Sequence, residues 1–372
     1  MTKHINPFKI LALAALFIVP AISHATGNED GSEKKKVISK TYNVTASEKL
    51  KIENSFGEVV INTWDKNEFK VDIEIYSKAT TDEKAQSILD QIKVNDSQSD
   101  NTVFFKTNIG HISGNSHNDN DDNDGDDDND NGDNKKHSHN NHGNNNQEFH
   151  VNYVVYMPSS NPLQIDNQFG KTTVPNFQGL VNLTSKFGSL TTGNLDNVQS
   201  IDVQFGKAEI GHIKNGKVNF QYDDKAHIID VSGITKLIVA FSGNTQFGIN
   251  DNIEELSVNE SYSTIKMIVS KTLSADFSIH TSFGEFHNKT DFKLTAQKDD
   301  DDNAGPTFDK DYTGKSGDGK AKIKIKSSFG EIRLSHNSGK DSDEEQDEKP
   351  ERKEKKEKKE KKEKPEKDEV NI

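Results

Sequence analysis

The chain has 372 residues, a length that accommodates two or three domains of about 100–200 residues each. Only 30% of the residues are hydrophobic and 29% are charged, so one dense core cannot extend over the whole length and some segments must be solvated. The net charge of −14 makes the chain a poor partner for nucleic acid or an anionic membrane surface. There is no cysteine, which excludes disulfide bonds, thiol catalysis and a lipid anchor on cysteine. Arg333 and Arg352 are the only arginines, so forked recognition of phosphate or carboxylate is almost absent.

The first 25 residues have the three parts of a secretory signal peptide. Lys3 and Lys9 give a basic start, residues 10–19 are apolar up to Pro20, and Ala25 closes an exit of small residues. The apolar stretch is too short for a bilayer, which takes about 20 residues. We therefore predict a signal peptide at 1–25, a flexible segment at 26–40, and an exported chain without a membrane span. Its compartment would be the periplasm or the cell surface.

An aromatic residue followed by glycine recurs along the chain. The complete copies are Phe56-Gly57, Phe169-Gly170, Phe187-Gly188, Phe205-Gly206, Phe283-Gly284 and Phe329-Gly330, and degenerate copies are Tyr222-Asp223, Phe241-Ser242 and Tyr262-Ser263. From Phe169 to Phe283 the aromatic residues follow at steps of 18, 18, 17, 19, 21 and 21 residues. Apolar residues also repeat four and six positions before the aromatic residue and three and five after it, so the copies share more than the pair.

This template predicts an all-β fold, a single-stranded β-solenoid of coils of about 18–21 residues with one short helix near its N-terminal end. Alternation up to the aromatic residue indicates a strand with one buried face, and the change of apolar parity after glycine requires a backbone corner. Glycine accepts the positive φ of such a corner. We expect the aromatic rings to stack inside the tube. The alternative is a β-sandwich with regularly spaced short strands.

The position two residues before the aromatic residue is often small and polar. It would form an inward hydrogen-bonding ladder or face a tight corner, and Glu260 fits neither arrangement. These positions include Asn54, Asn167, Ser185, Thr281 and Ser327.

The segments IENSFGEVVINTW (52–64) and VNYVVYMP (151–158), with the Phe-Gly coils that follow, resemble the bacterial putative adhesin family. The resemblance covers residues 41–334 apart from two insertions. It implies an exported, adhesin-like β-solenoid. It implies no catalytic residues, because the shared motif is structural.

Two elements outside the coils are predicted near the N-terminal end. Residues 80–94 place Ala85, Ile88, Leu89 and Ile92 on one helical face, with Thr80 and Glu83 as a capping box. This helix is expected to cover the open first coil. Residues 69–76 alternate and indicate a strand.

The polar insertion 114–147 contains Asp, Asn, Gly and His and no large apolar residue, which is typical of disorder. Asp127, Asn129, Asn131 and Asp133 resemble the opening of a calcium loop, but Ser138 replaces the bidentate Glu. We expect diffuse binding of divalent cations rather than a specific calcium cofactor. His137, His139 and His142 would otherwise ligate zinc or nickel, and solvated histidines are the simpler interpretation.

The other segments carry no predicted chemistry. The acidic insertion 295–320 includes a mimic of a phosphate-binding loop at 314–320, which we reject because Ala321 replaces Ser or Thr and a strand follows. Residues 335–372 are almost wholly charged and are expected to be a disordered tail.

We predict a non-enzymatic cell-envelope protein that binds an envelope glycan or a surface protein through stacked rows of Thr, Ser, Asn and Lys. A β-helix enzyme acting on polysaccharides is an alternative, for which the outward carboxylates are Glu58, Asp202, Glu209 and Glu285. A structural or signalling periplasmic component without a ligand is another. The sequence gives no oligomeric state.

Overall fold

Strands make up almost all of the regular structure. The computed structural model describes residues 31–110, 147–297 and 308–336, all of which belong to the unit Met1–Asn337. These residues form one mixed sheet of 22 strands and, within the described ranges, one helix, α1 (Asp82–Gln91). The predicted all-β class with one short helix is confirmed.

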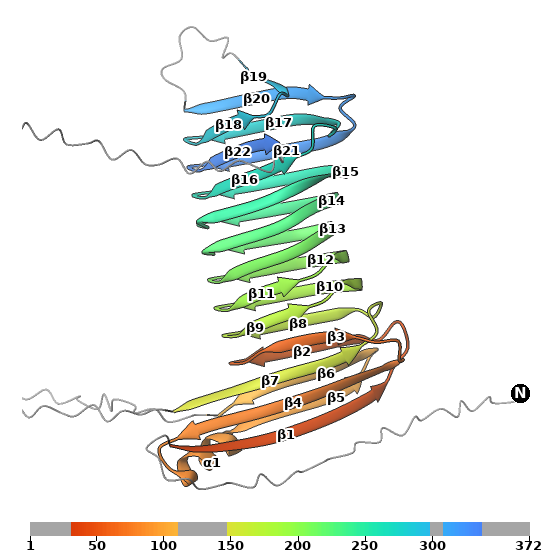
Figure 1. Cartoon of the computed structure of the whole chain (residues 1–372), viewed down its shortest axis with the longest axis vertical. Coiled ribbons are helices and arrows are strands. Elements are labelled where there is room, and N and C mark those ends of the chain that lie inside the picture. Colours follow the sequence, from red (N-terminus) through yellow and green to blue (C-terminus); the bar gives the residue numbers. More distant parts are fainter. Residues whose placement is uncertain (1–30, 111–146, 298–307, 337–372) are drawn as a thin grey trace, which may run out of the picture. The chain divides into compact units, whose positions relative to one another are not determined.

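One row of parallel strands contains the segment that precedes each aromatic residue (Figure 1). Its strands are, in spatial order, β2 (Lys49–Ser55), β8 (Leu163–Gln168), β10 (Phe177–Lys186), β12 (Leu195–Gln204), the second halves of β13 (Lys207–Gln221), β14 (Lys225–Ala240) and β15 (Asn244–Ser261), β21 (Ala321–Ser328) and β17 (Ala275–Ser282). Equivalent residues pair: Ile165 lies beside Ile52 on one side and Leu183 on the other, and all three are at most 1% exposed. The inner face of this row is therefore core.

A second row contains the segment that follows each aromatic residue. Its strands are β3 (Val59–Thr63), β9 (Lys171–Val174), β11 (Ser189–Thr192), the first halves of β13, β14 and β15, β16 (Thr264–Val269), β22 (Glu331–His336) and β18 (Glu285–Lys289). Ile210 and Ile228 pair in this row and are buried. The inward residues of both rows belong to one continuous apolar core.

The spatial order of strands departs from the chain order near the C-terminal end. β21 lies between β15 and β17, and β22 lies between β16 and β18. The sequence predicts that successive copies pair, and this is wrong for the copies at Tyr262 and Phe283, because the copy at Phe329 lies between them. The copies at Phe283 and Phe329 share one apolar pattern, so the pattern alone does not decide which of them lies beside β15.

Antiparallel strands form the N-terminal end. β1 (Ser32–Asn43), β4 (Glu68–Ala79) and β7 (Glu148–Met157) pair in that order, and a hairpin of β5 (Ile92–Ser99) and β6 (Thr102–Ile109) attaches to β2 through β6. The predicted strand 69–76 is confirmed within β4. Residues 32–40 belong to β1, so the flexible segment predicted there is wrong for that part. Its run of lysines at 34–36 obscures the alternation and is typical of an edge strand.

The helix is shorter than predicted. Its N-cap is Thr81 rather than Thr80, and the Thr81 Oγ1 atom accepts a hydrogen bond from the Lys84 backbone N–H at 3.3 Å. Ala85, Ile88 and Leu89 are buried, and α1 packs against β1 and β4.

The segment predicted as an acidic insertion is partly a strand. β19 (Lys293–Ala296) and β17 both pair antiparallel with β20 (Asp309–Ser316). Residues 309–316 are therefore part of the sheet, and residues 298–307 lie outside the described ranges. β21 follows as a strand, as predicted when the phosphate-loop mimic was rejected.

Candidate binding surface

The aromatic residues of the repeat form one continuous column. Neighbouring rings lie 4.8–5.1 Å apart between centroids, with interplanar angles of 2–8°. We call this set the aromatic column; in spatial order its rings are Phe56, Phe169, Phe187, Phe205, Tyr222, Phe241, Tyr262, Phe329 and Phe283. Phe308 stacks on Phe283 at 4.6 Å and extends the column by one ring.

The rings lie outside the core, contrary to the prediction that they stack inside the tube. Their exposed fractions are 39–54%. Every column residue has a φ between 51° and 61°, the left-handed region that side chains with a Cβ rarely adopt. This conformation at the corner turns the side chain outward, and stacking on both neighbours offsets its strain.

The glycine after each aromatic residue has a different role from the one predicted. Its φ is not positive; the aromatic residue takes that conformation instead. A Cβ on Gly170 would lie 1.8 Å from the Gly57 carbonyl oxygen, and one on Gly188 would lie 1.9 Å from the Gly170 carbonyl oxygen. Glycine is therefore required because successive coils approach each other closely at the corner.

Three consecutive coils have a side chain at this corner position, and these side chains hydrogen-bond from coil to coil. Asp223 Oδ1 accepts from the Gly206 N–H at 3.0 Å, Ser242 Oγ accepts from the Asp223 N–H at 3.3 Å, and Ser263 Oγ accepts from the Ser242 N–H at 3.1 Å. The next corner residue in space is Gly330, which has no side chain to continue the series.

The Glu260 carboxyl group ends this series, which explains why a charged residue stands two positions before Tyr262. Its Oε1 atom accepts from the Ser263 N–H at 2.6 Å, its Oε2 atom accepts from the Ser327 hydroxyl, and its carboxyl group lies where a side chain on Gly330 would be. Burial raises the pKa of Glu260. Burial also raises the pKa of Asp223 to about 7.

The small polar residues two positions before the aromatic residue point inward. Asn54 Nδ2 donates to Asn167 Oδ1 at 3.1 Å, and the Thr107 hydroxyl donates to Asn54 Oδ1 at 2.9 Å. The inward ladder is confirmed for these coils. It does not continue through Ser185, whose buried hydroxyl has no hydrogen-bond partner within the described ranges.

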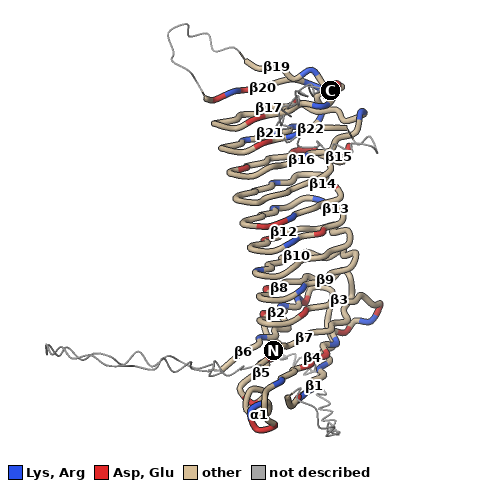
Figure 2. Tube along the Cα trace, turned by 60° about the vertical axis from the view of Figure 1, so that its left-hand side comes forward, with Lys and Arg blue, Asp and Glu red and all other residues tan. Residues whose placement is uncertain are grey.

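A row of longer polar side chains runs beside the column. The residues directly before four consecutive rings are Gln168, Lys186, Gln204 and Gln221, and all are half-buried. Their register places them next to one another on the outer face. Figure 2 shows that basic and acidic residues are both distributed along the stacked strands.

The outward carboxylates have different partners. Glu209 forms ion pairs with Lys225 and His227, and Asp202 accepts hydrogen bonds from Asn219 and Gln204. Glu285 lies beside Glu331 on the neighbouring strand, and the His287 Nε2 atom lies 3.0 Å from Glu285 and 3.2 Å from Glu331. No hydrogen bond or ion pair is found for the Glu58 carboxylate among the described residues.

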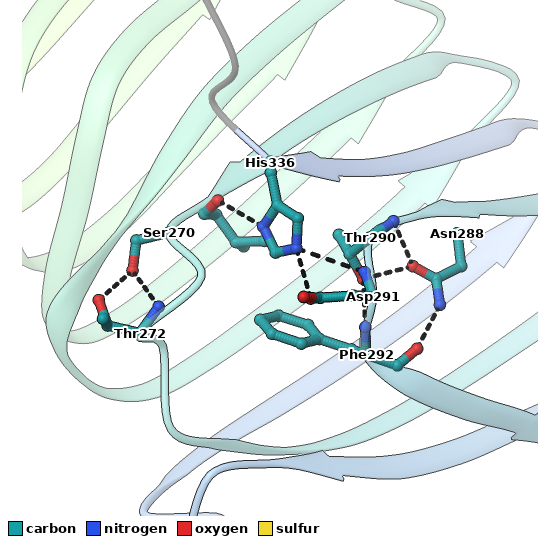
Figure 3. A network of polar contacts seen from close by, with 8 residues as sticks. Ser270, Thr272, Asn288, Thr290, Asp291, Phe292 and His336 are labelled. Atoms are coloured by element: carbon teal, nitrogen blue, oxygen red, sulfur yellow. Dashed lines mark hydrogen bonds and ion pairs between the residues drawn. The ribbon is translucent and has the colours of Figure 1, made fainter.

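Two polar clusters were missed by the sequence reasoning. Figure 3 shows one in which His336 Nε2 lies 2.7 Å from Asp291 Oδ1 and the His336 Nδ1–H donates to the Val269 carbonyl at 3.2 Å. This contact holds the Asn288–Phe292 turn against the end of β22, and the hydrogen bond with His336 lowers the pKa of the Asp291 carboxyl group. The other cluster is His212 with Asp230 and Ser232, of which His212 and Ser232 line a cavity. Its members come from two different strands, so no local sequence motif predicts the cluster.

The predicted cation ligands lie outside the described residues. These are Asp127, Asn129, Asn131 and Asp133, together with His137, His139 and His142. Among the residues that the structure describes, no group of three or more His, Asp or Glu side chains is placed to hold a metal ion. No helix within the described ranges is long and apolar enough to cross a membrane.

No protein-family model and no curated protein matches the chain. Two solved structures resemble it. One is a putative cell adhesion protein from Clostridium sporogenes, 14% identical, covering 82% of this chain and 100% of its own length, with a TM-score of 0.25. The other is a putative adhesin from Bacteroides fragilis, 14% identical, covering 80% and 97%, with a TM-score of 0.30. The function of this chain is argued below from its own surface.

Proposed function

We propose that the chain is an exported cell-envelope protein, in the periplasm or at the cell surface, whose stacked coils form a β-solenoid. Its function is to bind an envelope polysaccharide along the aromatic column. The observation that supports this most strongly is the continuous exposure of the rings, because contiguous apolar surface of this extent is typical of interaction sites.

The stacking geometry favours an oxygen-rich ligand. Each interior ring covers the faces of its neighbours, so its exposed part is the edge. Ring edges carry the positive part of the aromatic quadrupole and attract oxygen atoms such as those of sugar hydroxyls. Gln168, Gln204 and Gln221 beside the rings can donate to and accept from the same hydroxyls. Binding of this kind requires no bond cleavage.

Repetition provides affinity. A polymer that follows the column meets an equivalent ring edge about every 4.9 Å, so several weak contacts act together. Removing one ring from the middle of the column should therefore weaken retention of a long polymer more than that of a short oligosaccharide.

The test is retention of the purified protein on immobilised envelope polysaccharides. Phe205→Asn removes a central ring and keeps a residue that tolerates positive φ. We expect its retention to fall about tenfold, and Gln204→Ala to reduce retention less. Leu180→Asn is the matched control, because Leu180 is 47% exposed, compared with 46% for Phe205, and lies outside the column.

Three results would contradict the proposal. Equal retention of Phe205→Asn and Leu180→Asn would mean that the column is not the binding surface. Release of shortened sugars would favour the enzyme alternative. Recovery of proteins and no sugar from envelope extracts would favour a protein-binding or structural role.

A further inference from the structure

A polar cavity lies away from the aromatic column, where the first halves of β13, β14 and β15 end. Its volume is about 460 Å³, and it is lined by His212, Lys214, Ser232, Gly233, Asn250, Asn252 and Glu254. Ser232 is only 4% exposed although it lines the cavity. The cavity therefore contains a hydroxyl group that is shielded from bulk water.

His212 stands between an acid and this hydroxyl. Its Nδ1 atom contacts Asp230 Oδ1, and its Nε2 atom lies 3.0 Å from the Ser232 Oγ atom. The strand pairing explains the arrangement, because His212 on β13 is directly beside Asp230 on β14. Ser232 is two residues further along β14, which places it about 6.6 Å away along the strand. An imidazole ring with a hydrogen bond at each end spans such a distance.

The chemistry of these groups fixes the direction of both hydrogen bonds. An ionised carboxylate accepts only, so His212 Nδ1 carries the proton that points to Asp230. In the neutral ring Nε2 is then an acceptor, and the Ser232 hydroxyl donates to it. A hydroxyl that donates to an oriented imidazole is an activated nucleophile.

We propose that Ser232, His212 and Asp230 form a hydrolytic site for small carboxylic esters. Ser232 Oγ bonds to the acyl carbon while its proton passes to His212 Nε2. His212 then gives this proton to the leaving alkoxide as the ester C–O bond breaks. Water, deprotonated by His212, cleaves the acyl-serine, and Ser232 regains its proton. Lys214 lines the same cavity and supplies a cation for the developing oxyanion. Asp230 is the positioning residue. This proposal revises the expectation of a protein without catalysis and does not depend on the aromatic column.

The test uses the full mature chain and a fluorophosphonate probe, with the modified residue located by mass spectrometry. We expect labelling at Ser232, no labelling of Ser232→Ala, and labelling of His212→Gln slowed by about 100-fold or more. Ser200→Ala is the matched control, because the Ser200 hydroxyl on β12, the strand beside β13, donates to Asn182 and not to a histidine. This control should label as the native protein does.

A second measurement tests Asp230 without relying on activity. The strongly deshielded proton of His212 Nδ1–H should be visible by ¹H NMR in the native protein and in Ser232→Ala, and absent in Asp230→Asn. Absence of labelling at Ser232 under conditions that label a known serine hydrolase would overturn the proposal. Equal labelling of the native protein and His212→Gln, with thermal unfolding unchanged, would also overturn it.

Discussion

At the scale of single residues, the aromatic residue and the residue that follows it have different roles at each corner. The aromatic residue adopts the positive φ, whereas the residue after it lies against the previous coil. In most coils that second residue is glycine, because the adjacent backbone leaves no room for a Cβ. Where it is Asp223, Ser242 or Ser263, the side chain instead satisfies a neighbouring N–H group.

Gly188→Ala should destabilise the fold strongly. The new Cβ would lie 1.9 Å from the Gly170 carbonyl oxygen, so two coils would have to separate locally. We expect the free energy of unfolding in urea to fall by about 2–4 kcal/mol. Gly243→Ala is the control, because its Cβ would lie 3.5 Å from the nearest atom, the Asp224 carbonyl oxygen, and should change stability by less than about 1 kcal/mol. Equal losses for both variants would refute the close-approach explanation.

Asp223 should make stability depend on pH. Its pKa in the folded chain is about 7, above the ordinary 3.8, so the folded state holds the proton more tightly than the unfolded state. The resulting stabilisation is complete below about pH 4 and is lost as the pH rises through 7. One carboxyl oxygen of Asp223 is buried without a hydrogen-bond partner among the described residues, which adds to the cost of the charged form.

Asp223→Asn should therefore increase the free energy of unfolding at pH 8 by about 1–3 kcal/mol and have much less effect at pH 5. Urea unfolding at the two pH values measures this difference. Asp224→Asn changes the exposed neighbour and controls for net charge. If both variants respond alike at pH 8, the buried carboxyl is not the cause.

At the scale of elements, the aromatic column stabilises the stack as well as presenting a surface. An interior ring stacks on two neighbours, whereas Phe308 at the end stacks, among the described residues, on Phe283 alone. Each aromatic pair contributes about 0.5–1.5 kcal/mol beyond the area it buries.

Phe187→Asn should lower the free energy of unfolding by about 1–3 kcal/mol, and Phe308→Asn by about half as much. Thermal and urea unfolding of the two variants, with Leu180→Asn as a control for loss of exposed apolar surface, measure the difference. A loss that does not depend on position in the column would show that the rings act independently.

The sequence predicted the strands of the repeat, their period and their inward apolar residues, because alternation is local to each copy. It did not predict that the rings face solvent. A Phe-Gly pair such as Phe205-Gly206 does not reveal in sequence which of its two residues adopts the positive φ. The cluster of His212, Asp230 and Ser232 could not be foreseen either. Its residues become neighbours only when β13 and β14 pair in register.

At the scale of the whole described unit, the stack depends on its last strands. β21 and β22 lie inside the stack rather than at its end, so β15 and β17 have no direct pairing without β21. Their loss would expose the edges of β15 and β17 together with core residues of these strands such as Val258 and Ile279.

A chain that ends after residue 297 should therefore lose more than its missing strands. We expect limited proteolysis to cut within β15–β18 and the unfolding transition to broaden or divide. A chain that ends after residue 336 is the control and keeps both parallel rows intact. Retention of native protease resistance by the shorter chain would contradict the importance of β21.

The position of β21 also has a consequence for biosynthesis. The ribosome makes β15, β16, β17 and β18 before β21 and β22, yet β21 must finally lie between β15 and β17, and β22 between β16 and β18. A nascent chain can therefore assemble its earlier coils in the order of translation, but the final two must wait. Until residue 328 has emerged, the second half of β15 has β14 as its only partner, and this interval is when a chaperone would have most to protect.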